Sequence, residues 1–151
     1  MVHMWRSTAC VAVLGSCLLL AACAGPVPDE GAYRHAALQT SMAMVSALAS
    51  GQLAAQTDLR GNSFSPFTDG NVTNAENDAS SVNSTFSSRQ PPDARSDVLR
   101  QKMLQALSDG TSALTDLRVA VRMDDRAQVR RALAEVGKSL KTFGSLQQEL
   151  Q

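Results

Sequence analysis

The segment RAQVRRALAEVGKSLKTFGSLQQEL, residues 126–150, decides the fold class of this chain. Its apolar side chains recur at intervals of four, three, four and three residues, which places them along one face of an α-helix. Asp124 or Asp125 stands at the start, where an acidic side chain caps a helix well. The pattern therefore predicts an amphipathic helix over 125–150. Its apolar row is Val129, Leu133, Val136, Leu140 and Phe143, with Leu150 continuing it.

The segment before it has the same period and predicts a helix over 94–122. Asp93 is the expected N-cap, and Arg89-Gln90-Pro91-Pro92 breaks the chain just upstream, because a residue before proline avoids the helical region. The expected buried row is Val98 or Leu99, Met103, Ala106, Leu107, Leu114, Leu117 and Val121. The charged side chains are expected mostly outside this row: Arg100, Lys102, Asp109, Asp116, Arg118 and Arg122.

A third helix is predicted over 32–60, ending at Gly61, which can adopt the left-handed cap conformation. Its main apolar row has helical spacing and is expected to face the core. This row is Leu38, Met42, Val45, Ala49 and Leu53. Further apolar residues widen it: Tyr33, Ala37, Met44, Ala47, Leu48 and Ala55.

The stretch from 61 to 88 is the most ambiguous part. Residues 61–70 are interpreted as a loop whose Phe64 and Phe67 fold back onto the protein. Thr73 with Glu76 matches a capping box, and the apolar period beyond it predicts a short helix over 73–88. Because Ser and Asn dominate this segment, a solvated linker is the alternative.

Together these segments predict an all-α protein, an up-down four-helix bundle over 32–151 that follows an N-terminal signal peptide. The 73–88 helix would be its shortest and least stable member. Leu, Ala, Met, Gln and Arg dominate the rest of the chain, which favours helix.

The N-terminus predicts export. Arg6 is followed by an uncharged run of about 16 residues, shorter than a spanning helix requires. The run ends in Leu20-Ala21-Ala22-Cys23, which resembles the lipobox of bacterial lipoproteins. That resemblance implies cleavage between Ala22 and Cys23, diacylglycerol and further acyl chains such as palmitate on Cys23, and anchoring outside the cytoplasm at the cell membrane or outer membrane.

Residues 1–22 are then the signal peptide and residues 23–31 a tether. Ordinary secretion and a short uncleaved anchor are the alternatives. Cleavage would remove Cys10 and Cys17 and consume Cys23, so no thiol would remain for a disulfide or a metal site. Acyl groups on Cys23 would be the only cofactor-like component.

Charge and motif content narrow the function. The mature chain would hold 14 acidic and 13 basic residues, a balance that argues against binding to nucleic acid. The sequence has no Gly-x-Ser-x-Gly motif, no Glu-x-x-His pair and no phosphate-binding loop. Its one mature histidine, His35, is expected on the surface. We therefore expect no enzymatic activity and no metal.

Arg126, Arg130 and Arg131 form the best polar cluster, together with Lys138 and Lys141. They could contact anionic headgroups or a cell-wall polymer. The competing interpretation is a solvated face balanced by neighbouring acids: Asp124, Asp125 and Glu135.

Residues 83–143 resemble uncharacterised helical lipoproteins of actinomycete-type bacteria, through the corner Phe86 to Pro92 and the segment Leu117 to Asp125. The resemblance implies no specific function. We expect a structural or interaction module with a protein or cell-wall partner, in which Phe64 and Phe67 could form an exposed patch. The alternative is a small-molecule-binding or sensing bundle with a cavity near Gly51, Gly110 and Gly137.

Overall fold

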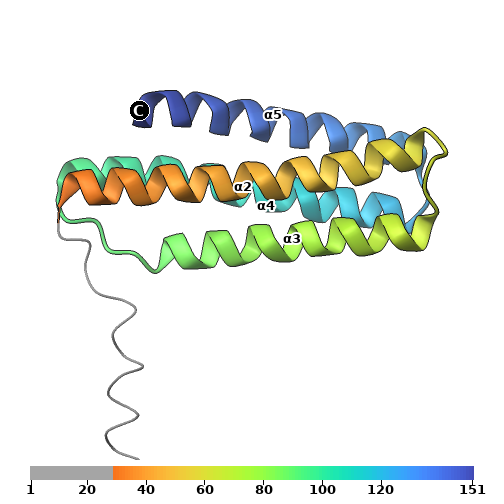
Figure 1. Cartoon of the computed structure of the whole chain (residues 1–151), viewed down its shortest axis with the longest axis horizontal. Helices are drawn as coiled ribbons and strands as arrows, with labels where there is room; N and C mark the ends of the chain where they lie inside the picture. Colours follow the sequence, from red (N-terminus) through yellow and green to blue (C-terminus); the bar gives the residue numbers. More distant parts are fainter. Residues whose placement is uncertain (1–28) are drawn as a thin grey trace, which may run out of the picture.

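The computed structural model describes residues 29–151, and within them the chain folds into four long α-helices (Figure 1). They run alternately up and down, so the predicted all-α four-helix bundle is confirmed. The lipobox and the rest of the signal peptide lie outside the described residues. The helices are α2 (Glu30–Leu59), α3 (Ser65–Ser87), α4 (Ala94–Arg122) and α5 (Arg126–Leu150).

The four helices form a rhombus rather than a square. Each helix packs on its two neighbours, and α2 also packs on α4 across the diagonal, whereas α3 and α5 do not meet. The start of α2, the α3–α4 connection and the C-terminus lie toward one end (Figure 1), called here the Asp29 end after the N-cap residue of α2. The α2–α3 connection and the α4–α5 turn lie at the other, called here the Phe64 end.

Two glycines allow α2 and α4 to approach closely across the diagonal. A methyl group added to Gly51 would lie 2.6 Å from Cδ2 of Leu114. One added to Gly110 would lie 3.4 Å from the Phe143 ring and 3.5 Å from the Met44 sulfur. The expected cavity at these two positions is therefore wrong, because Leu114, Phe143 and Met44 occupy the space.

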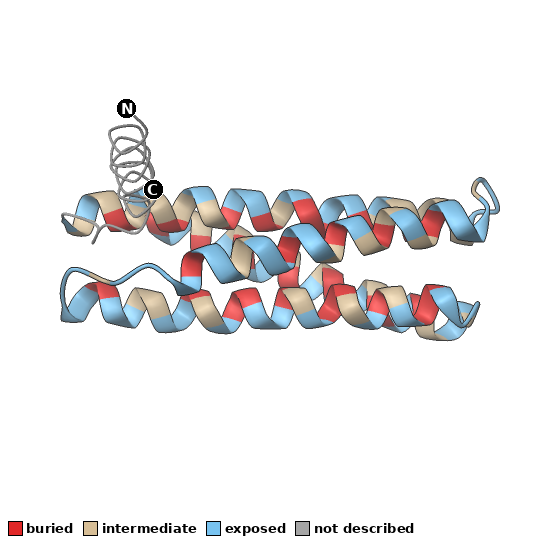
Figure 2. Cartoon of the chain, turned by 90° about the horizontal axis from the view of Figure 1, so that it is seen from below, coloured by how far each residue is buried: buried red, intermediate tan, exposed pale blue. Residues whose placement is uncertain are grey.

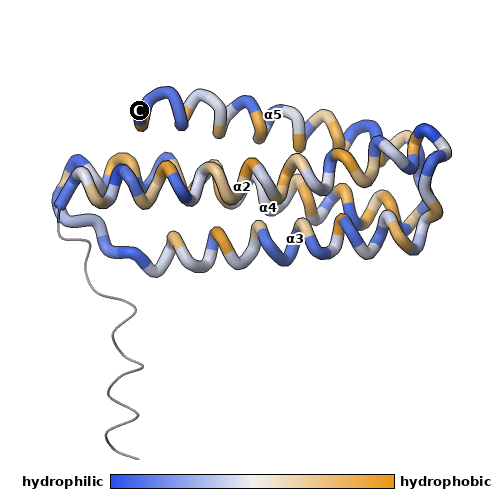
Figure 3. Tube along the Cα trace, in the orientation of Figure 1, coloured by the Kyte–Doolittle hydropathy of each residue, from blue (hydrophilic) through white to orange (hydrophobic). Residues whose placement is uncertain are grey.

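Apolar residues recur along all four helices (Figure 3), and the buried positions form rows that face the centre (Figure 2). The rows predicted for α4 and α5 are largely confirmed, and the largest fully buried side chains include Met103, Leu107, Leu114, Leu117, Val136 and Phe143. At the Asp29 end, the fully buried Tyr33 ring packs 5.8 Å from the Phe86 ring.

Predicted caps are also present. Asp93 Oδ1 accepts a hydrogen bond from the Ser96 amide at 2.8 Å, and Asp125 Oδ1 accepts from Ala127 and Gln128 at 2.9 and 3.0 Å. Gly61 has a φ of 76°, the left-handed conformation expected after α2. At its start, α2 reaches two residues into the predicted tether.

The predicted start of the second helix is wrong. It begins at Ser65, not at 73, and Phe64 is its N-cap residue instead of Thr73. Pro66 fits because the first helical turn needs no backbone N–H donor there. Fully buried Thr68 and Val72 then hold these two added turns against the bundle. The segment is a helix throughout, so the solvated-linker alternative is also wrong.

The predicted buried row of α2 is only partly correct: Leu38 and Val45 are partly buried and pack against the core, but the other three residues are exposed. Met42 and Leu53 are 52% and 62% exposed, and Ala49 is exposed as well. The core is formed instead by the residues expected only to widen the row. This buried row combines large side chains with small ones, and the small ones, together with Gly51, let α2 lie close to its neighbours. Its members are Tyr33, Ala37, Met44, Ala47, Leu48, Gly51 and Ala55.

Candidate interaction surface

Charge divides the bundle into two unlike halves. No charged residue lies between His35 and Asp58, which covers most of α2, whereas α3 carries three acids and no basic residue. By contrast, α4 and α5 carry most of the charges of the described chain. From residue 36 to residue 88 the charged residues are Asp58, Arg60, Asp69, Glu76 and Asp78.

The outward side of α2 carries a row of exposed neutral residues, called here the α2 stripe: Met42, Ser46, Ala49 and Leu53. Their spacing of four, three and four residues keeps them on one helix face. Soluble proteins usually place charges on such a face. The stripe therefore leaves apolar and small side chains in solvent on a helix that is already packed on its other side.

A shallow groove follows the seam between α2 and α3 beside this stripe. Near the Phe64 end it has a volume of about 350 Å³ and is lined by Ser50, Leu53, Ala54, Thr57, Ser63, Phe67 and Asn71. Toward the Asp29 end a second hollow of about 220 Å³ lies between the same helices, lined by Gln39, Thr40, Ala43, Ser81, Val82 and Thr85. Neither lining contains a charged side chain.

Phe64 and Phe67 extend this apolar area. They are 66% and 59% exposed and stack on each other with ring centroids 5.9 Å apart. The expectation that they fold back onto the bundle is wrong, because the early start of α3 directs them away from the core. They lie instead beside Leu53, since Phe67 and Leu53 line the same groove.

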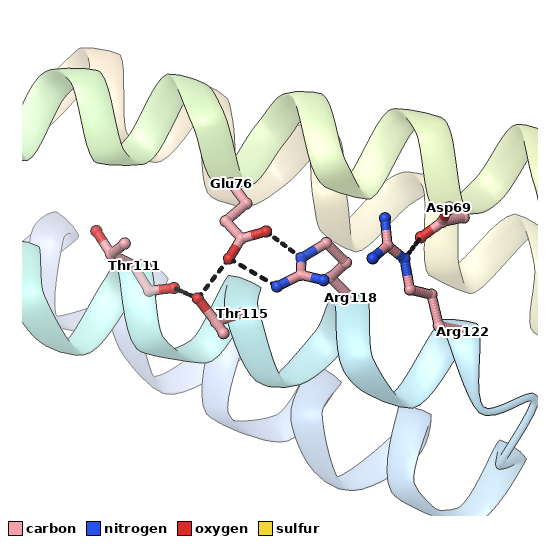
Figure 4. A network of polar contacts seen from close by, with 6 residues as sticks. All are labelled: Asp69, Glu76, Thr111, Thr115, Arg118 and Arg122. Carbon is pink, nitrogen blue, oxygen red and sulfur yellow. Dashed lines mark hydrogen bonds and ion pairs between the residues drawn. The ribbon is translucent and has the colours of Figure 1, made fainter.

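A polar network at the α3–α4 seam holds α3, and with it this surface, in place (Figure 4). Glu76 pairs with Arg118, and the Thr115 hydroxyl donates to Glu76 Oε1 at 2.7 Å. Only 15% of the Glu76 side chain and 22% of the Arg118 side chain are exposed. Two turns away along α3, Arg122 Nε donates to Asp69 at 2.8 Å.

The environment of Glu76 favours its ionised form. Burial alone would raise the pKa of this carboxyl, but hydrogen bonds from Arg118 and Thr115 outweigh that effect, and the pKa is lowered from its ordinary value. Glu76 is therefore ionised at neutral pH and can hold α3 against α4 through its pair with Arg118. Arg118 was expected among the exposed residues of its helix, so its partly buried position is a correction.

The predicted arginine cluster is divided. Arg126 donates to the main-chain oxygen of Leu59 on the α2 side, where it helps to close the end of that helix. Arg131 lies on the α4 side, in a groove of about 380 Å³ that also includes Asp116 and Glu135. Arg130 is exposed. The structure thus does not gather the three residues at one point, and acids surround Arg131.

The other residues predicted from the sequence take part in no cluster among the described residues. His35 is exposed on α2, Gly137 has open space around it, and Cys23 with Ala22 lies outside the described residues. None of the four described helices has the length and apolar character of a membrane span. Residues 29–151 also hold no group of three or more His, Cys, Asp or Glu side chains placed to bind a metal ion.

No protein-family model, curated protein or solved structure that was compared with the chain matches it.

Sequence reasoning missed the network and the α2 stripe, although the exposed patch expected at Phe64 and Phe67 is present. Glu76 was interpreted as part of a capping box, and Arg118 as a surface charge; they lie 42 residues apart in sequence, so local spacing could not pair them. The sequence does contain a signal for the α2 stripe: a long helix without any charged residue between His35 and Asp58 lacks the charges of an ordinary solvated face.

Proposed function

We propose that this protein is a lipid-anchored, non-enzymatic module of the bacterial cell envelope that binds a partner through its α2–α3 surface. The observation that carries the anchor is the sequence Leu20-Ala21-Ala22-Cys23 after an apolar run. The exposed, neutral α2 stripe and the adjoining Phe64–Phe67 pair support the binding role.

The proposed anchor would hold the bundle close to the membrane. The chain from Cys23 to Asp29 spans at most about 20 Å when fully extended. Helix α2 has 30 residues and is therefore about 45 Å long. The Asp29 end would lie near the lipid, while the Phe64 end could reach well away from it. Two or three acyl chains on Cys23 would make the attachment stable without a spanning helix.

Replacing Cys23 tests the anchor. We expect Cys23→Ala to abolish incorporation of a labelled fatty acid and to move the protein from the membrane fraction to the soluble fraction or to an unprocessed precursor. Cys17→Ala is the matched control, because it changes a cysteine in the segment to be removed and should leave labelling intact. Normal labelling and membrane retention of Cys23→Ala would contradict the proposal.

Photo-crosslinking in intact envelopes tests the binding surface. A photoreactive residue at Leu53 lies on the α2 stripe, and one at exposed Ser108 on α4 is the control. We expect a discrete protein adduct from position 53 and none from position 108. Equal or absent adducts at both positions would remove the α2–α3 surface as the binding site.

A small-molecule-binding or sensing role is the second candidate. The groove beside Leu53 and Phe67, at about 350 Å³, is within the size range of ligand pockets, which starts at about 300 Å³. A partly apolar ligand that stacks on Phe67 would fit its uncharged lining. Ligand-dependent melting that is lost in Phe67→Ala would favour this role over protein binding.

A further inference from the structure

We propose that the α2–α3 surface binds a second copy of this chain, so that two bundles pair side by side with their α2 stripes in contact and their Asp29 ends together. This proposal rests on the proposed function, because the orientation follows from a shared membrane anchor. It names the partner of the surface described above.

The neutrality of the surface favours pairing with itself. In a two-fold symmetric dimer each copy presents the same patch, so any net charge on the patch would face the same charge. The α2 stripe carries no charge at all, and neither do the linings of the two hollows beside it. The exposed Asp78 of α3 lies at helical spacing from Asn71 and Val82, which line these hollows, and so it flanks the stripe without belonging to it. Two α2 stripes in direct contact therefore meet no repulsion from each other.

The order of side chains along the stripe is also suited to a helix pair. Ser46 and Ala49 are small and central, while Met42 and Leu53 are long and lie at its two ends. Spacings of four and three residues are those of coiled-coil contact positions. In a parallel pair each residue meets its own counterpart, so small side chains allow close approach at the centre and long ones pack at both ends.

The parallel and antiparallel orientations of the pair differ in where the two acylated Cys23 residues lie. A parallel pair places both Asp29 ends together, where two copies acylated at Cys23 can share one membrane leaflet. Confinement to one surface also raises the effective concentration of each copy for the other. An antiparallel pair centred on the stripe would separate the two Asp29 ends by about 55 Å along the helix axis. When such a pair stands upright on the membrane, the short chain from Cys23 to Asp29 does not span that distance.

The available area is sufficient. Neighbouring helix axes lie about 8–10 Å apart and each helix is about 10–12 Å wide, so the α2–α3 side is about 20 Å wide. Contact over about 30 Å of its length would cover roughly 600 Å² on each copy. The total of roughly 1,200 Å² reaches the lower limit of stable protein interfaces. Phe64 and Phe67 lie at one end of this area and add to it.

Disulfide crosslinking of the full-length protein in its own membrane tests the pairing. Disulfides form when the Cα atoms are about 4.4–6.8 Å apart. In a parallel pair, Leu53→Cys meets its own counterpart and should give a dimer on mild oxidation. In an antiparallel pair centred on the stripe, the two substituted positions would be about 16 Å apart, and only a mixture of Met42→Cys and Leu53→Cys chains would crosslink.

Matched controls separate specific pairing from chance encounters. Ser108→Cys on α4 and the wild-type chain give the background of random collisions and of the natural cysteines. Adding Ser46→Lys to Leu53→Cys places two positive charges at the centre of the pair and should abolish the dimer. Adding Ser108→Lys should not. All these positions are exposed, so the substitutions spare the core, and unchanged protease resistance verifies the fold.

Each outcome decides the proposal. A Leu53→Cys dimer that Ser46→Lys removes and Ser108→Lys spares supports it. Crosslinking of the mixed chains alone overturns the parallel orientation. No dimer from a correctly lipidated protein, together with a Leu53 photo-adduct to another protein, overturns self-association but leaves the proposed function intact. If the Leu53→Cys chain forms no dimer and its new thiol is shielded from a membrane-impermeant maleimide, the bilayer covers the surface and self-association is wrong.

Discussion

At the scale of single residues, Glu76 links α3 to the more highly charged helix α4. It is the carboxylate of α3 that faces Arg118 and Thr115 on α4, and it is largely removed from solvent. A buried charge that lost its partner would be costly, so the network favours one position of α3 against α4. That position also determines where Phe67 and the α2–α3 groove lie.

Glu76→Gln should lower the free energy of unfolding by roughly 1–2 kcal/mol at neutral pH, because it removes a charged hydrogen bond from Arg118. The effect should depend on pH. Since the pKa of Glu76 is lowered in the folded protein, its stabilising contribution is full above the unfolded value of about 4.5 and is lost as pH falls through the folded pKa. Urea unfolding followed by circular dichroism from pH 7 to pH 3 should show the wild type approaching the variant. A constant difference across this range would contradict the ionised role of Glu76.

Two glycines should respond to alanine in opposite ways. At Gly137 a methyl group meets no neighbour, so Gly137→Ala should stabilise α5 by about 0.5–1 kcal/mol through helix propensity. At Gly51 the same methyl group would overlap Leu114, and the cost of moving that fully buried side chain should cancel or exceed the gain. Melting temperatures of the two variants measure this difference. A comparable rise in both would show that α2 and α4 do not pack closely at Gly51.

At the scale of elements, α3 differs from the other three helices. It is the shortest of the described helices and is rich in Ser, Asn and Thr, which are weak helix formers. It has no leucine, and its buried apolar side chains are few: Val72, Ala75, Ala79 and Phe86. Packing and two ion pairs with α4, rather than intrinsic propensity, hold it as a helix.

Hydrogen exchange should therefore find α3 the least protected helix. We expect the central amides of α3 to exchange through local opening at least ten times faster than those of α2, α4 and α5. Exchange followed by mass spectrometry measures this on the intact protein. Glu76→Gln should increase the rate in α3 selectively, whereas Lys138→Gln, which breaks an exposed pair within α5, should not. Equal protection in all four helices would contradict this view of α3.

Helix α2 shows why a helix can be predicted correctly while its buried face is assigned incorrectly. It has apolar residues on two faces, so periodicity identifies the helix without indicating which face is buried. The row with Leu53 is bulkier in sequence, yet the row with Gly51, Ala47 and Ala55 is in the core. This face is buried because its small residues let α2 contact α3 and α4 at short range, while Tyr33, Met44 and Leu48 on the same face fill the core.

At the scale of the whole molecule, the diagonal contact between α2 and α4 joins the bundle into one unit. Leu114 lies at its centre, fully buried and opposite Gly51. Leu114→Ala should lower the free energy of unfolding by about 2–5 kcal/mol, because it removes buried methyl groups and leaves a cavity beside Gly51. The exposed Val119→Ala on the same helix is the control and should change stability by well under about 1 kcal/mol.

The loss should affect all helices together. Urea unfolding of Leu114→Ala should remain a single transition at a lower midpoint, with circular dichroism and hydrogen exchange in α2, α4 and α5 reporting the same change. If only α4 lost protection, the diagonal would not couple the helices. The surface would then depend on α2 and α3 alone.

The sequence by itself determined what local interactions control. Helix periods, the caps Asp93 and Asp125, the break at Pro91-Pro92 and hence the four-helix class follow from residues close together in the chain. Only the tertiary structure decided which face of α2 is buried, that α3 begins at Ser65, and that Glu76 meets Arg118. These features depend on contacts between segments that are distant in the sequence. Helix α2 has two apolar faces, so its own sequence does not determine which face is buried until α3 and α4 pack against it.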